Sequence, residues 1–165
     1  MRAFEQLMRA HEHVAFRAAH AVTRNHADAE EAVQEAFLNA YRSLRRFRRG
    51  LPFRPWLLRI VLNEAKDRRH AAARARGLAE RADQEAGARA EAPATVPVID
   101  AERRSLLLAA LDRLPAKQRD VVTCRYLLEL SEEETAATLS LRPGTVKSRL
   151  SRALTRLEAD LEGAL

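Results

Sequence analysis

The sequence has one cysteine, few aromatic residues and no long apolar stretch, and each shortage excludes a class of protein. Cys124 is the single thiol among 165 residues, so the chain cannot close an intramolecular disulfide bond. Aromatic residues make up 5% of the chain, which disfavours a β-sandwich because strands are enriched in aromatic side chains. No apolar run approaches the roughly 18 residues needed to cross a bilayer, and the N-terminus lacks the apolar region of a signal peptide. We therefore expect a cytoplasmic protein that does not insert into membranes.

Residue types that bind metals or catalyse reactions are poorly grouped. His11 and His13 are two residues apart, so they face different sides of a helix, and no cysteine lies near them, His20 or His26. The sequence shows no nucleophile paired with a base and no phosphate-binding loop. We expect no metal, no cofactor and no enzymatic activity.

Helix breakers are also scarce, with five Gly and six Pro. Apolar residues recur at three- and four-residue spacing, which predicts amphipathic helices. The expected helices cover residues 3–23, 27–47, 54–76, 100–113, 116–128, 132–139 and 144–161. Residues 77–98 have no large apolar periodicity and contain Pro93 and Pro97, which is typical of a flexible linker. The fold class that we expect is all-α, with two small helical domains at 1–76 and 99–165 joined by that linker.

Positive charge is abundant and unevenly distributed. The formal net charge is +6, and Arg supplies 26 of the 29 cationic residues, which favours a polyanionic partner. A GC-rich genome would also enrich Arg. Residues 26–41 hold four acids and no Lys or Arg, whereas residues 42–76 hold twelve cations and two acids. This contrast indicates two different partners, although acids also suit the start of a helix because they match its dipole.

Residues 131–157 contain the most informative pattern. Ser131 and Glu134 predict a capping box at the start of a short helix. A compact turn of Arg142, Pro143 and Gly144 precedes a second helix with an apolar stripe. This spacing predicts a helix-turn-helix, whose second helix enters the major groove of DNA; the alternative is a solvated helix pair. The residues expected to contact DNA are Arg142, Thr145, Lys147, Ser148, Arg149, Ser151 and Arg152.

The two halves resemble the sigma-70 family of RNA polymerase sigma factors, in its extracytoplasmic-function (ECF) group. Residues 114–126 and the string Gly-Thr-Val-Lys-Ser-Arg at 144–149 resemble sigma region 4. Residues 28–42 and 53–69 resemble sigma region 2. Ala32 and Thr135 depart from the pattern, since many relatives have Asp and Ile at these places. The resemblance implies a three-helix region 2 domain, a four-helix region 4 domain, and promoter recognition at −10 and −35 elements.

The resemblance also implies partners. The helix at 28–44 would bind the clamp coiled coil of the largest polymerase subunit, region 4 would meet the flap, and a cognate anti-sigma factor would be an expected regulator. The residues expected to contact polymerase are Glu31, Gln34, Glu35 and Asn39. The loop at 48–55 would hold a flipped base of the −10 element. The other expected −10 contacts are Arg54, Arg59, Asn63, Lys66, Asp67, Arg68 and Arg69.

Two other functions fit parts of the sequence. A stand-alone helix-turn-helix regulator would bind an operator tightly without polymerase. A sigma-like decoy would bind polymerase without opening promoters. Matching patterns in both halves favour the sigma factor.

Overall fold

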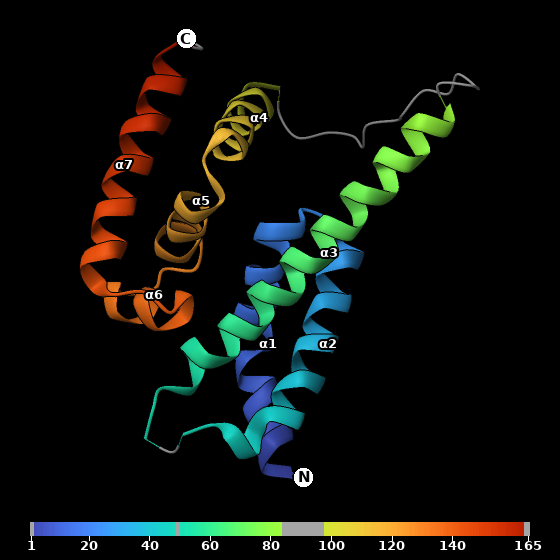
Figure 1. Ribbon diagram of the computed structural model, residues 1–165, viewed down its shortest axis with the longest axis vertical. Helices are drawn as coiled ribbons and strands as arrows, with labels where there is room; N and C mark the ends of the chain where they lie inside the picture. Colours follow the sequence, from blue (N-terminus) through green and yellow to red (C-terminus); the bar gives the residue numbers. More distant parts are fainter. Residues whose placement is uncertain (1, 49, 84–97, 164–165) are drawn as a thin grey trace.

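The computed structural model describes residues 2–48, 50–83 and 98–163. Within these ranges every regular element is a helix, which confirms the expected all-α class. The first bundle contains α1 (Arg2–Thr23), α2 (His26–Ser43), the short 3₁₀ turn η1 (Leu44–Arg46) and α3 (Phe53–Asp83). The second bundle contains α4 (Val98–Arg113), α5 (Ala116–Val122), the π-helical turn η2 (Thr123–Leu127), α6 (Glu132–Leu139) and α7 (Pro143–Glu162). The second bundle lies beside the first, with η2 against α1 and α6 against α3 (Figure 1).

Small side chains hold the first bundle together. An alanine at a helix contact lets two helices approach closely, because only one methyl group separates the backbones. The buried alanines of this bundle are Ala15, Ala18, Ala19, Ala29, Ala32, Ala36, Ala40 and Ala65. Leu57, Leu58 and Val61 of α3 are fully buried and fill the space between the helices. Asn25 caps α2, since its side-chain oxygen accepts a 2.9 Å hydrogen bond from the backbone N–H of Asp28.

Helix α3 is longer than the sequence pattern predicts. The pattern predicts an end near Arg76, but α3 continues to Asp83, so the first seven residues of the expected linker are helical. These residues are mostly Ala, Arg, Leu and Glu, which favour helices strongly enough to tolerate Gly77. Residues 84–97 of the expected linker lie outside the described residues, and its last residue, Val98, is the first residue of α4. Across the described ranges, no helix is both long and apolar enough to cross a bilayer.

The second bundle changes direction at η2. The sequence predicts one helix over 116–128, but the chain widens into a π turn at Thr123, and the N–H of Leu128 bonds to the carbonyl of Thr123. Beyond the turn, α6 covers 132–139 as predicted, and α7 begins one residue earlier than predicted, at Pro143. Val121, Ala136 and Val146 form a small core between α5, α6 and α7.

The two bundles share apolar contacts. Cys124, Leu128 and Leu130 are buried in the same cluster as Leu57 and Leu58 of α3, rather than in the cores of their own bundle. Cys124 is thus a free thiol buried at the contact between the bundles. Opening the two bundles would therefore expose apolar surface on both.

Candidate nucleic-acid interface

The helix-turn-helix is built as the sequence predicts. The Oγ of Ser131 accepts from the N–H of Glu134 at 3.0 Å, and a Glu134 carboxylate oxygen accepts from the N–H of Ser131 at 2.9 Å. This reciprocal pair is the predicted capping box. Helix α6 ends at Leu139, and the next residue, Ser140, has a left-handed φ of 56° that turns the chain sharply. Arg142 is extended, and Pro143 then starts α7 at a position where a missing N–H has no consequence.

Helix α7 presents its polar residues to solvent. Val146 and Ala153 of α7 are fully buried against the rest of the bundle, and their burial fixes which face of the helix points to solvent. Lys147, Ser148, Ser151 and Arg152 are exposed. Of the other candidates for −35 contacts, Arg142 is exposed, whereas Thr145 and Arg149 are half-buried. Five of the seven side chains are therefore open to a DNA groove in this structure.

The loop between α2 and α3 borders an open pocket that is also lined by α3 and α6, and three aromatic rings lie at this place. Phe47 and Trp56 have ring centroids 4.9 Å apart, and Phe53 lies 5.3 Å from Trp56. Trp56 is half-buried: part of its side chain packs against the core of the first bundle, and the rest remains accessible. The pocket has a volume of about 260 Å³, and its lining includes Arg46, Phe47, Arg48, Leu51, Pro52, Pro55, Trp56, Arg59 and Ala137. Apolar walls beneath arginine side chains suit a planar base with a phosphate beside it.

The candidate −10 residues divide into two groups. Arg54, Arg59, Lys66 and Arg69 bond to the second bundle. Asn63 lines a pocket between the bundles, Asp67 is exposed, and Arg68 turns the other way and pairs with Glu31 of α2. The predicted set therefore does not lie on one face of α3.

The candidate polymerase face on α2 is partly engaged within its own bundle. Glu31 pairs with Arg68, and Glu35 lies 3.7 Å from Arg42. Gln34 is exposed, but the Asn39 amide is half-buried and donates to Glu64 at 2.8 Å. Leu38, which was not among the predicted contacts, is 51% exposed on the same helix. Leu38 lies four positions after Gln34 and therefore on the same polar face of α2. An apolar residue on such a face could have been recognised from the sequence as a candidate contact.

Known proteins match both bundles. Residues 7–75 match the family "Sigma-70 region 2" and residues 104–157 match "Sigma-70, region 4". The ECF RNA polymerase sigma factor SigM of Mycobacterium tuberculosis is 36% identical over 165 residues, which span 94% of this chain and 75% of that protein. The chain is an ECF sigma factor of the sigma-70 family. As a sigma factor, it acts in transcription initiation with core RNA polymerase and promoter DNA.

Other relatives of this sigma factor agree. The ECF sigma-E factor of Escherichia coli K12 is 35% identical over 134 residues, covering 76% of this chain and 70% of that protein. The solved structure of CnrH with the cytosolic domain of CnrY superposes with a TM-score of 0.71 at 28% identity, covering 98% of this chain and 89% of that chain. RpoE of Bartonella quintana, solved with the anti-sigma factor NepR, gives 0.66 at 26% identity, covering 98% of each chain. The fold of the whole sigma factor, and not of one domain alone, is therefore shared.

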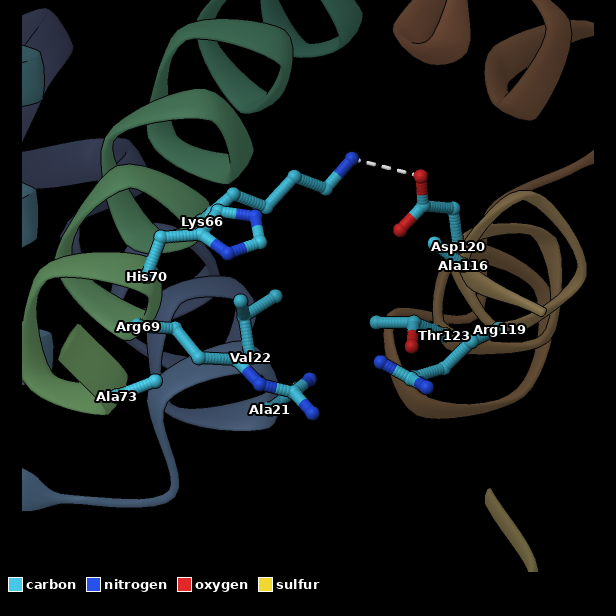
Figure 2. A pocket seen from close by; sticks show the side chains of 10 residues that line it. All are labelled: Ala21, Val22, Lys66, Arg69, His70, Ala73, Ala116, Arg119, Asp120 and Thr123. Carbon is cyan, nitrogen blue, oxygen red and sulfur yellow. Dashed lines mark hydrogen bonds and ion pairs between the residues drawn. The ribbon is translucent and has the colours of Figure 1, made fainter. Parts of the chain in front are cut away.

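Region 2 and region 4 of this sigma factor meet across a pocket of about 320 Å³. Figure 2 shows the pocket with Lys66 on one side and Asp120 on the other, joined by an ion pair of 2.6 Å between Nζ and Oδ2. Asp112 of α4 accepts from both Arg24 and Arg69, at the edge of the same interface. Arg24, Asp112 and Asp120 could not be singled out from the sequence, because partners so far apart in the chain leave no local pattern.

Half-buried Arg119 and buried Cys124 lie beside this interface, and both have shifted pKa values. The Arg119 side chain donates to the carbonyls of Leu111, Asp112 and Leu114 at 2.7–2.9 Å and so ties the end of α4 to α5. Burial lowers the pKa of Arg119, and the nearby cation Arg69 lowers it further. Burial also raises the pKa of Cys124 to about 12, with Asp120 adding to the effect. This thiol stays protonated and unreactive at neutral pH.

Proposed function

We propose that this sigma factor reads the −35 element with α7 and the −10 element with α3 and the loop before it. The observation that carries the proposal is the row of Lys147, Ser148, Ser151 and Arg152, which is open to solvent on a helix whose rotation is set by buried Val146 and Ala153. Ser148, Ser151 and Arg152 share a face by three- and four-residue spacing. Arg and Lys suit guanine edges, and Ser suits either base of a pair.

The loop pocket supports the −10 assignment. A promoter base that leaves the stack needs an apolar slot and a nearby cation for its phosphate. Phe47 and Trp56 line the pocket, and Arg48 and Arg59 lie at the same site. We propose that the flipped base enters here, and that the exposed Asn63 and Asp67 contact the strand beyond it.

We further propose that α2 binds the polymerase clamp through Glu31, Gln34 and Glu35, with the exposed Leu38 adding apolar contact. Asn39 contributes by fixing Glu64 beside this face. Region 4 would meet the flap with α4, where Leu106 and Leu107 are exposed. In this assembly the polymerase performs the chemistry, and the sigma factor works in the cytoplasm as a non-enzymatic specificity subunit.

A regulatory partner is also proposed. RpoE of Bartonella quintana was solved with an anti-sigma factor, and CnrH was solved with the cytosolic domain of CnrY. Because both structures superpose on nearly the whole of this chain, we propose that an anti-sigma factor binds here in the same manner.

Run-off transcription on genomic DNA with core polymerase, followed by sequencing of the transcript starts, tests the function. We expect starts that share a −10 and a −35 element. Arg152→Ala should cost about 1–3 kcal/mol at one −35 position and relax its preference, whereas Arg103→Ala, at an exposed position on α4, should leave the −35 preference unchanged. An unchanged −35 preference in Arg152→Ala overturns the base-reading role. Operator binding without polymerase would favour a stand-alone regulator, and polymerase binding without transcripts would favour a decoy.

A further inference from the structure

The pocket of about 320 Å³ between α3 and α5 has an excess of positive charge. Three permanent cations, Lys66, Arg69 and Arg119, belong to its lining, against one carboxylate, that of Asp120. All four side chains are half-buried, so water screens their charges less than it would on an open surface. The lining therefore carries two positive charges that no carboxylate of the pocket balances.

The two arginines of the pocket point toward one another. Figure 2 shows the guanidinium group of Arg69 coming from α3 and that of Arg119 coming from the opposite wall. Like charges repel, and the charge of Arg69 adds to the effect of burial in lowering the pKa of Arg119. Asp112 accepts a hydrogen bond from Arg69 at 3.1 Å, but it also accepts one from Arg24, so its single charge is shared between two cations. An anion between Arg69 and Arg119 would relieve the remaining repulsion.

The cations of the pocket also retain unused hydrogen-bond donors. Among the described residues, Arg119 donates through Nε and Nη2 to backbone carbonyls, and its Nη1 makes no hydrogen bond. Arg69 donates through Nη2 alone, and Lys66 gives one of its three N–H groups to Asp120. Arginine and lysine N–H groups bind phosphoryl oxygens by charge-assisted hydrogen bonds. A tetrahedral phosphoryl group could accept from all three side chains at once.

The remainder of the lining is largely apolar. Ala21 and Val22 of α1, Ala73 of α3 and Ala116 of α5 form these walls, and their small side chains leave the space open. A volume of about 320 Å³ lies at the lower end of the range for small-molecule sites. The pocket can therefore hold a small organic group beside an anion.

We propose that this pocket binds a small phosphate monoester, with its doubly charged phosphoryl group between Arg69 and Arg119 and its organic part against the alanine side chains. The phosphoryl dianion is the chemistry that the cations recognise, and free phosphate shares it. Lys66 and Arg69 are also candidates for −10 DNA, but each phosphate of a nucleic-acid backbone is a diester with a single negative charge. The inference does not depend on the proposed function, and a preference for the dianion distinguishes the two.

A titration of the full chain, followed by amide NMR spectroscopy, tests the class of ligand. The probes are phenyl phosphate, inorganic phosphate, sulfate and diethyl phosphate, at constant ionic strength and at pH 8, above the second pKa of about 6 of a phosphate monoester. We expect phenyl phosphate to cause saturable shifts at pocket residues of both regions, and sulfate, another tetrahedral dianion, to bind as inorganic phosphate does. Diethyl phosphate should bind at least about tenfold more weakly, because it has one charge fewer.

The results separate the possible ligands. Tighter binding of phenyl phosphate than of inorganic phosphate supports an organic monoester, whereas equal affinities overturn the organic part and identify free phosphate as the ligand. Diethyl phosphate that binds as tightly as phenyl phosphate overturns the dianion site and assigns these cations to the nucleic-acid backbone, so the proposed function stands. The absence of saturable shifts at the pocket with every probe overturns the site altogether.

Two variants locate the site. Ala73→Glu places a carboxylate among the pocket cations, four residues after Arg69, and Ala75→Glu makes the same change at an exposed position of α3 outside the pocket. Arg119→Gln removes a cation from the region 4 wall, and its control is Arg103→Gln at an exposed position of α4. Each pocket variant should bind phenyl phosphate at least about tenfold more weakly than its control, with circular dichroism unchanged.

The comparison at Ala73 decides the outcome if Arg119→Gln fails to fold, since Arg119 also ties α4 to α5. Ala73 is exposed on a helix, so its replacement by glutamate disturbs no core packing. Equal affinities of Ala73→Glu and Ala75→Glu for phenyl phosphate overturn the assignment of the ligand to this pocket.

Discussion

Replacing Thr135 with Val should make region 4 more stable. Thr135 is fully buried in α6, and its Oγ1 has no hydrogen-bond partner among the described residues. Most buried hydroxyl groups are hydrogen-bonded, because an unpaired one has lost its contact with water and gained nothing in return. Valine has nearly the same shape, so it replaces the hydroxyl with a methyl group and leaves the packing intact.

Two contributions set the size of the effect. A hydroxyl that is buried without a partner costs about 1–3 kcal/mol in mutational data. The methyl group that replaces it adds about 0.8 kcal/mol of apolar burial. Local relaxation reduces both, so we expect the free energy of unfolding to rise by about 1–2 kcal/mol. With a urea dependence of about 1–2 kcal/mol per molar, the unfolding midpoint should increase by roughly 1 M.

Urea unfolding followed by circular dichroism measures this change. Thr155→Val is the matched control, because Thr155 is exposed on α7 and its Oγ1 donates to the carbonyl of Ser151 at 3.1 Å. The control should shift the unfolding free energy by no more than about 0.5 kcal/mol. An unchanged or lower midpoint for Thr135→Val would show that the Thr135 hydroxyl is satisfied in solution, and the reasoning would be refuted.

Three other predictions follow from the structure. Charge reversal at Glu31 and Glu35 should weaken binding to core polymerase with helicity unchanged, as measured by surface plasmon resonance against Glu12→Arg; equal affinity contradicts the α2 assignment. Ser131→Ala should lower the free energy of unfolding by about 1 kcal/mol in urea, because it removes the capping box; no loss means that another group caps α6. The pKa of Cys124 is raised from 9.0 to about 12, so its contribution to stability is complete below pH 9 and is lost as the pH rises toward 12. Between pH 8 and pH 10 the original protein should therefore lose about 1 kcal/mol more stability than Cys124→Ala, and parallel curves would contradict this.

Local patterns predicted the second bundle best. The capping box at Ser131 and the turn before Thr145 are written into adjacent residues, and α6 and α7 fall within one residue of the prediction. The π turn at η2 was not predictable, because the apolar spacing of residues 116–128 fits an ordinary helix. The length of α3 was missed for a related reason, since its last turns have helix-forming residues without an apolar stripe.

The candidate site was predictable by residue type but not by arrangement. Charge alone singled out the arginines of α3, yet it could not show that Arg68 faces α2 while Arg69 faces region 4. Lys66 and Asp120 are 54 positions apart, so only the packing of the two domains reveals their pairing. The roles of these residues in DNA binding stay predictions.

The position of the only tryptophan has a practical consequence. Trp56 is half-buried in the lining of the loop pocket, with its ring tilted against that of Phe47, and it is the one indole in the sequence. Its fluorescence is therefore a label-free optical sensor at the place where promoter melting would begin. A nucleobase that stacks in the loop should quench the emission, whereas departure of α6 should shift it to longer wavelength as water reaches the ring. Because the two signals differ in kind, stopped-flow fluorescence can determine which event comes first.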